Sequence, residues 1–192
     1  YIDGMYITVT YEKKKPRKNS KLVKMLEKQG ANISFFKWVY NFSKARQFAL
    51  DQVPKGDDIF VYWQDADDVL QGAENLKPVM MDMVAQNIAA VYFTYWYMVD
   101  LDENGEVREV LVEHKRERII RNNDSWSWVG PLHETLIEKK TENMVKIFRD
   151  DCVVVHLTDN TRLDKNIDRN IQILEEALRE DNHKDPRNRI YL

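Results

Sequence analysis

The sequence predicts an α/β protein with a mixed sheet flanked by helices, followed by a C-terminal helical segment. Short β-branched and aromatic runs alternate with helical periodicity through the first half of the 192-residue chain. One of these runs, residues 59–63, lies between a turn with Pro and Gly and a group of carboxylates. Residues 163–180 repeat apolar side chains at helical spacing. We therefore expect a sheet domain over residues 1–162 and a helical segment over residues 163–192.

The first half of the chain contains five expected elements. Ser20 can accept hydrogen bonds from the free amides at a helix start, and Gly30 can adopt the left-handed conformation that ends a helix. Phe42, Ala45 and Phe48 share one face of the next helix. In chain order, the expected elements are a strand at 5–10, a helix at 21–29, a strand at 33–38, a helix at 41–52 and a strand at 59–63.

The second half is expected to contain a hairpin and a long terminal helix. Residues 102–105, Asp-Glu-Asn-Gly, carry turn chemistry between two β-rich runs. Ile167, Ile171 and Leu174 lie at helical spacing, so we expect them to pack the terminal helix beside the sheet. A second helix is expected to start after Pro186, as in a helical hairpin. The expected elements are a short helical stretch from Asp68 or a neighbour, a helix at 80–87, strands at 89–98, 107–112, 117–121 and 152–155, and a helix at 163–180.

Two carboxylates directly after the strand at 59–63 form the strongest candidate site. Asp65 and Asp67 are two residues apart, so an extended chain aims both at one point beyond the strand's end. In open α/β sheets, ligands bind at that edge. Hard carboxylate oxygens suit Mg²⁺ or Mn²⁺, and these ions in turn suit a diphosphate. The alternative is a solvated acidic turn that caps the next helix.

Composition and charge exclude several classes of protein. Lys and Arg total 29 against 32 acidic residues, and the net charge of −3 gives no overall drive toward nucleic acid or an anionic membrane. Neither is expected as a partner. Cys152 is the single cysteine, so no internal disulfide is possible and a reducing, cytoplasmic location is expected. No apolar run is long enough to span a bilayer. The chain opens at Tyr1 almost directly into a strand, so we expect it to be part of a longer protein.

Several further side chains are candidates from their setting in the sequence. Trp96 lies in an aromatic strand that is richer in Tyr and Trp than a core requires, although core packing is the default interpretation. A sugar-binding platform would combine it with three further candidates: Trp126, Trp128 and His133. Arg118 and Arg121 are candidates for phosphate binding, with surface salt bridges as the alternative.

Four motifs occur in a fixed order along the chain. They are Asn41-Phe42-Ser43-Lys44-Ala45-Arg46, Trp63-Gln64-Asp65-Ala66-Asp67-Asp68, Arg118-Ile119-Ile120-Arg121-Asn122 and Trp128-Val129-Gly130-Pro131-Leu132-His133-Glu134. Together with the helical tail, this ordered set resembles glycosyltransferase family 2, in the bacterial and bacteriophage branch that often carries tetratricopeptide-like helices. The resemblance covers residues 35–192, and the set is more specific than any one of its motifs.

The resemblance implies a GT-A fold with a Rossmann-like sheet, a nucleotide-sugar donor, a divalent metal and inversion at the anomeric carbon. A UDP-sugar is the expected donor, and the acceptor is unknown. Asp65 and Asp67 match the metal and diphosphate motif, and His156 falls where a third metal or diphosphate contact is common. Arg46 matches an arginine near the nucleotide. Glu134 falls where a catalytic base is plausible, because an inverting transfer needs one group to take the acceptor's proton.

Other interpretations of the same residues stay open. Glu134 is alternatively a loop carboxylate paired with an arginine, and His156 a buried, hydrogen-bonded core residue. Gln47 stands where the family usually has Asn. The whole domain is alternatively a catalytically degenerate scaffold in a larger, bacteriophage-type assembly. A nucleotidyltransferase would need a phosphate-binding loop that is not visible here. The basic run at 13–18 is expected to be a solvated loop, with a nucleic-acid arm as the sharper alternative.

Overall fold

The computed structural model describes residues 2–139, 144–157, 163–180, 185 and 188. By its internal contacts the chain forms two compact units, each described by itself below. Unit 1 comprises Tyr1–Pro54, Trp126–Lys139 and Thr161–Leu192, and unit 2 comprises Lys55–Ser125 and Lys140–Asn160. This division differs from the boundary expected at residue 162, which stays a prediction. The expected α/β class is confirmed, because helices and sheets occur together in the described chain.

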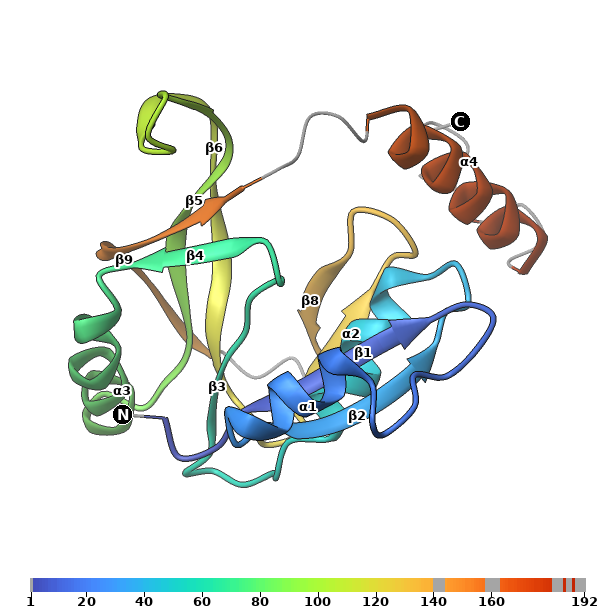
Figure 1. Cartoon of the computed structure of the whole chain (residues 1–192). Coiled ribbons are helices and arrows are strands. Elements are labelled where there is room, and N and C mark those ends of the chain that lie inside the picture. The colour runs from blue at the N-terminus through green and yellow to red at the C-terminus, as the bar shows by residue number, and fades with distance from the viewer. Residues whose placement is uncertain (1, 140–143, 158–162, 181–184, 186–187, 189–192) are drawn as a thin grey trace. The chain divides into compact units, whose positions relative to one another are not determined.

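Unit 1 contains two small sheets and three helices in the described chain (Figure 1). Its parallel pair is β1 (Tyr6–Tyr11) with β2 (Asn32–Lys37), and its antiparallel pair is β7 (Trp126–Val129) with β8 (Thr135–Glu138). The helix α1 (Lys21–Lys28) contacts β2, and α2 (Phe42–Asp51) contacts β1, β2 and β7. The third helix is α4 (Leu163–Glu180). The first four expected elements are thus confirmed, with ends within one or two residues.

The two N-terminal helices start at side-chain caps, of which the sequence predicts Ser20. The Ser20 hydroxyl accepts a hydrogen bond from the Val23 amide at 3.4 Å, and the Asn41 side chain accepts one from the Lys44 amide at 2.9 Å. Gly30 follows the end of α1 with φ +75°, the left-handed conformation that glycine adopts at low cost.

The α4 helix has the predicted bounds, but a different face of it is buried. Ile173, Leu174 and Leu178 are buried, whereas Ile167 and Ile171 are 55% and 43% exposed. The prediction that these two isoleucines pack is therefore wrong, and it is right for Leu174. Among the α4 side chains that the structure describes, at residues 167–180, the buried ones begin at Ile173, so apolar spacing alone did not identify the covered face. The second helix expected after Pro186 lies outside the described residues.

Unit 2 is built on a five-stranded mixed sheet in the order β3-β6-β5-β9-β4 (Figure 1). The strands are β3 (Phe60–Tyr62), β4 (Asp68–Gln71), β5 (Ile88–Leu101), β6 (Val107–Arg121) and β9 (Val145–His156). Only β5 and β9 pair in parallel within this sheet. The helix α3 (Leu76–Ala85) packs on β5, and Val79, Met83, Phe93, Ile119 and Val154 contribute to the core beneath it. A mainly antiparallel sheet does not by itself match the Rossmann-like arrangement that was expected.

Three expected elements of unit 2 differ from the structure. The helical stretch expected from Asp68 is the strand β4, because Asp68–Gln71 pairs with the end of β9. The strands expected at 107–112 and 117–121 are the single strand β6, since pairing with β5 carries the chain through the charged residues between them. The helix expected at 80–87 starts earlier, at Leu76.

The hairpin turn between β5 and β6 is confirmed. The Asp102 side chain accepts hydrogen bonds from the amides of Asn104 and Glu106, both at 2.9 Å, and Gly105 has φ +81°. No helix of the described chain is both long enough and apolar enough to cross a membrane.

Candidate functional site

The acidic segment after β3 is a turn and not an extension of the strand. The Asp68 amide donates to the Asp65 carbonyl at 3.2 Å, and the Asp65 amide donates to the Asp68 carboxylate at 3.1 Å. Because β3 ends at Tyr62, the alternation that was expected to aim Asp65 and Asp67 at one point does not apply. The turn instead sends Asp68 into the sheet as the first residue of β4.

Asp68 and His156 occupy opposite positions on neighbouring strands. In the antiparallel pairing of β4 with β9, Asp68 lies directly across from His156, and their Oδ1 and Nδ1 atoms are 3.0 Å apart. The amide of Leu157, the residue after the end of β9, donates to the Asp67 carbonyl at 2.8 Å. The ladder therefore fixes the backbone on both sides of this pair.

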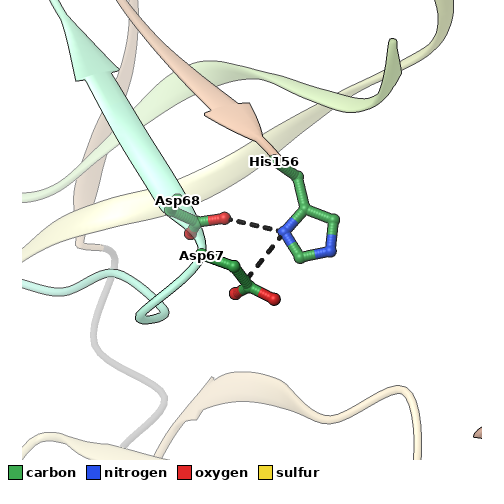
Figure 2. A group of neighbouring side chains, drawn as sticks. All are labelled: Asp67, Asp68 and His156. Carbon is green, nitrogen blue, oxygen red and sulfur yellow. Dashed lines mark hydrogen bonds and ion pairs between the residues drawn. The ribbon is translucent and has the colours of Figure 1, made fainter. Parts of the chain in front are cut away.

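Asp67, Asp68 and His156 form a compact group of potential metal ligands (Figure 2). One ligand atom from each lies within 4.8 Å of the others, and the Asp67 Oδ1 atom is 3.8 Å from His156 Nδ1. Two of the three expected ligands, Asp67 and His156, are thus brought together. Asp68 takes the place expected for Asp65, which lies outside this group. The sequence signal for Asp68 was present, as the third acid of the same motif.

Arg118 neutralises Asp68 inside the protein. Its side chain is 1% exposed, and its Nη1 atom donates to Asp68 Oδ2 at 2.9 Å. The guanidinium group lies over the rings of Trp63 and Tyr95, 4.3 Å from each centroid. The charge of Arg118 is therefore in contact with one carboxylate and two aromatic rings. The structure places the expected phosphate ligand Arg118 behind the candidate metal group, as the counter-ion of one carboxylate.

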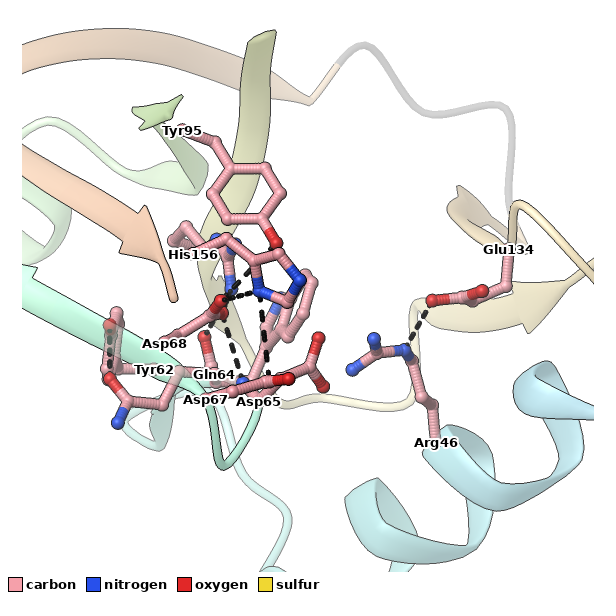
Figure 3. Close-up of polar contacts among 11 residues, drawn as sticks. Arg46, Tyr62, Gln64, Asp65, Asp67, Asp68, Tyr95, Glu134 and His156 are labelled. Carbon is pink, nitrogen blue, oxygen red and sulfur yellow. Dashed lines mark hydrogen bonds and ion pairs between the residues drawn. The ribbon is translucent and has the colours of Figure 1, made fainter. Parts of the chain in front are cut away.

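Hydrogen bonds occupy both oxygens of the Asp68 carboxylate. Oδ2 accepts from Arg118 and from the Asp65 amide, and Oδ1 accepts from His156 and, at 3.3 Å, from the Tyr95 hydroxyl. Burial raises the pKa of the Tyr95 phenol, so it remains a donor at neutral pH. Asp68 is held in one orientation by this network (Figure 3).

The pKa values of Asp68 and His156 are shifted in opposite directions. Burial alone would raise the pKa of Asp68, but the hydrogen bond with His156 and the charge of Arg118 outweigh it, so the pKa is lowered. The pKa of His156 is raised, chiefly by the hydrogen bond to Asp68, with burial opposing and the charges of Asp67 and Asp65 assisting. The network therefore favours an ionised Asp68.

Aromatic rings enclose the His156 imidazole. Tyr97 stacks on it with an interplanar angle of 2° and a centroid distance of 5.8 Å, and Tyr95 meets it edge-on at 6.0 Å. His114 of β6 contacts the Tyr97 ring at 5.6 Å. These rings restrict how the imidazole can turn, which keeps its Nδ1 atom directed toward Asp67 and Asp68.

Arg121 does not join Arg118. It donates to the carbonyl oxygens of Asp57 at 2.8 Å and Met83 at 3.4 Å, and it lies over the Phe60 ring. Arg121 therefore contacts elements other than those around Arg118, which pairs with Asp68. The structure gives Arg121 an anchoring role within unit 2.

Glu134 and Arg46 form an ion pair in unit 1 (Figure 3). Arg46 Nε donates to Glu134 Oε1 at 2.6 Å, and the two side chains are only 20% and 11% exposed. Arg46 also lies over the Trp128 ring at 5.2 Å. This arrangement matches the alternative that Glu134 is a loop carboxylate paired with an arginine, and it leaves the base role untested.

The loop that carries Glu134 is held tightly between β7 and β8. Gly130 has φ +89° and His133 has φ +53°, both in the left-handed region. The Pro131 carbonyl accepts a hydrogen bond from the Phe42 amide at 2.9 Å, which ties the loop to the start of α2. The backbone thus sets the direction in which Glu134 leaves the loop.

Two of the four residues expected to form a sugar platform are buried. Trp126 and Trp128 are 3% and 7% exposed, and the Trp128 amide donates to the Gln47 side chain at 3.0 Å. Both belong to unit 1 with the exposed His133, whereas Trp96 is half-buried in unit 2. Buried indole rings pack the protein interior and present little face to a sugar.

No protein-family model matches this chain, and no curated protein is significantly similar to it. The functional argument therefore rests on the residues themselves.

Proposed function

We propose that this protein is a metal-dependent, inverting glycosyltransferase of GT-A type that moves a sugar from a nucleoside-diphosphate sugar, such as a UDP-sugar, to an acceptor hydroxyl. The observation that carries the proposal is the Asp67–Asp68–His156 group at the ends of two paired strands. The ordered motifs around Arg46, Asp65 and Glu134 support it.

The donor atoms of this group fit a divalent metal. The carboxylate of Asp67 and the imidazole of His156 offer an oxygen and a nitrogen ligand, a set that suits Mn²⁺ better than the all-oxygen preference of Mg²⁺. Asp67 has a side chain that is 56% exposed and is the open carboxylate of the group. Asp68 is fully enclosed, so its main task would be to orient His156, as carboxylates behind metal-bound histidines do.

A bound metal would stabilise the negative charge of the leaving diphosphate. The residues of this chain have separate tasks. Asp67 and His156 would hold the metal, and Asp68 with Arg118 would keep the imidazole in place. In unit 1, Glu134 would accept the proton of the acceptor hydroxyl, with Arg46 fixing the direction of its carboxylate.

Binding of UDP and Mn²⁺ tests the proposal directly. Titration calorimetry of the whole chain with UDP should show binding that requires Mn²⁺. Asp67→Asn should weaken that binding by at least tenfold, because it removes the exposed carboxylate. Asp58→Asn is the matched control, since Asp58 is also exposed but lies outside the group.

Two results would redirect the proposal. Equal binding by the Asp67→Asn and parent proteins would remove the metal group from donor recognition. Metal-dependent UDP binding without any hydrolysis or transfer of a UDP-sugar would favour the catalytically degenerate domain instead.

A further inference from the structure

Positive charge is concentrated in one short segment of unit 1. Residues 13–28, which we call the basic segment, contain Lys13, Lys14, Lys15, Arg17, Lys18, Lys21, Lys24 and Lys28 and a single acid, Glu27. The segment has a net charge of +7, while the whole chain has −3, which leaves −10 on the rest. The net charge of the whole chain therefore does not reveal this local excess of positive charge. The segment comprises the loop after β1 and the helix α1.

The charges of the basic segment lie at the protein surface. All eight basic side chains are exposed. Within the part of the chain that the structure describes, none of them forms a salt bridge with a carboxylate. The contact of Lys15 is with the Phe35 ring, 4.7 Å from its centroid. Unpaired charges this dense raise the local potential and attract a polyanion.

Apolar side chains project between these lysines. Val23 and Leu26 bury one face of α1. Helical spacing places Lys21, Lys24 and Lys28 on the opposite face, and Met25 lies among them. Met25 is 53% exposed, and Leu22, on the flank between the two faces, is 43% exposed. A helix that presents lysines and apolar side chains together to solvent is typical of a membrane-surface helix.

We propose that the basic segment docks this protein on an anionic membrane surface, an interaction that goes beyond the proposed transfer reaction. The lysines and Arg17 would meet lipid phosphates, and Met25 with Leu22 would enter the headgroup region. A nucleic acid would satisfy the charges but not the exposed apolar side chains. Proteins that bind single strands stack bases on aromatic rings, and residues 13–28 contain no aromatic residue.

Vesicle cosedimentation of the whole chain tests this proposal. The protein should bind vesicles of phosphatidylcholine mixed with phosphatidylglycerol, bind phosphatidylcholine alone far more weakly, and release as salt is raised. The triple variant Lys21→Gln, Lys24→Gln and Lys28→Gln should lose about a hundredfold in affinity, since each basic residue near an anionic surface contributes about fivefold. Gln keeps a good helix propensity, so α1 should persist.

Matched controls distinguish an effect of the basic segment from an effect of positive charge elsewhere on the protein. Lys77→Gln, Lys139→Gln and Lys146→Gln remove the same charge from exposed positions outside the segment and should change affinity little. Met25→Gln should weaken vesicle binding by about tenfold, as expected when a buried apolar side chain becomes polar. Met81→Gln, which alters an exposed methionine of α3, should not.

Three results would overturn the proposal. Equal binding to neutral and anionic vesicles would remove the role of charge, and equal losses in the two triple variants would remove the role of this segment. Binding to single-stranded DNA but not to vesicles, with no effect of Met25→Gln, would assign the segment to nucleic acid. Circular dichroism of each variant checks that its fold is retained.

Discussion

Asp68 and His156 face each other across the β4–β9 ladder, with Oδ1 and Nδ1 3.0 Å apart. The same carboxylate neutralises Arg118, whose side chain is 1% exposed. One residue therefore links the candidate metal group to the interior of unit 2, and changes at Asp68 should affect stability as well as metal binding.

Asp68→Asn should lower the free energy of unfolding by about 3 to 5 kcal/mol, because it leaves the buried charge of Arg118 without its counter-ion. Urea denaturation followed by tryptophan fluorescence measures this. Asp67→Asn is the matched change at the neighbouring exposed position and should cost less than about 1 kcal/mol. Similar losses in the two variants would contradict the assigned role of Asp68.

Glu134→Gln should reduce turnover of a UDP-sugar by about two to four orders of magnitude, the usual contribution of a general base. Metal-dependent UDP binding should stay close to that of the parent. Glu138→Gln in the adjoining strand β8 is the control for loss of a carboxylate from the same hairpin. Unchanged turnover in an active protein would exclude Glu134 from the reaction and leave it as the ion-pair partner of Arg46.

Gly72→Ala should destabilise the protein by more than about 2 kcal/mol. Gly72 has φ +77°, and a Cβ atom there would overlap the carbonyl oxygen of Asp151. Gly105→Ala is a matched control, because Gly105 has φ +81° but open space around it. That change should cost only the backbone strain of about 1 to 2 kcal/mol. Thermal unfolding of both variants measures the difference, and equal costs would mean that β9 moves aside at Asp151.

Cys152 should be unreactive in the folded protein. It is fully buried, its thiol donates to the Gly72 carbonyl at 3.3 Å, and burial raises its pKa from about 9 to about 11. A thiol-specific reagent at pH 8 should therefore label it slowly until urea is added. The pKa of this thiol is higher in the folded protein than in the unfolded protein. The free energy of unfolding should therefore fall as the pH rises above the pKa of the unfolded thiol. Rapid labelling of the native protein would show that β9 opens.

The elements that the sequence predicts best are those decided by neighbouring residues. Ser20 caps its helix, and Asp102 and Gly105 close the hairpin turn, because each hydrogen bond spans only a few residues. The bounds of α4 also follow from its apolar spacing. The α/β class is established on the same local grounds.

Long-range pairing decides the features that the sequence does not predict. Residues 68–71 are a strand and not a helix because β9 pairs with them, and that pairing brings Asp68 to His156 from 88 positions away. Leu174 of α4 is buried and Ile167 is exposed, and this difference depends on which parts of the protein pack against the helix. The sequence by itself determined that carboxylates and a histidine are available. The tertiary structure decided that Asp68 joins Asp67 and His156, because only the strand register sets which side chains meet.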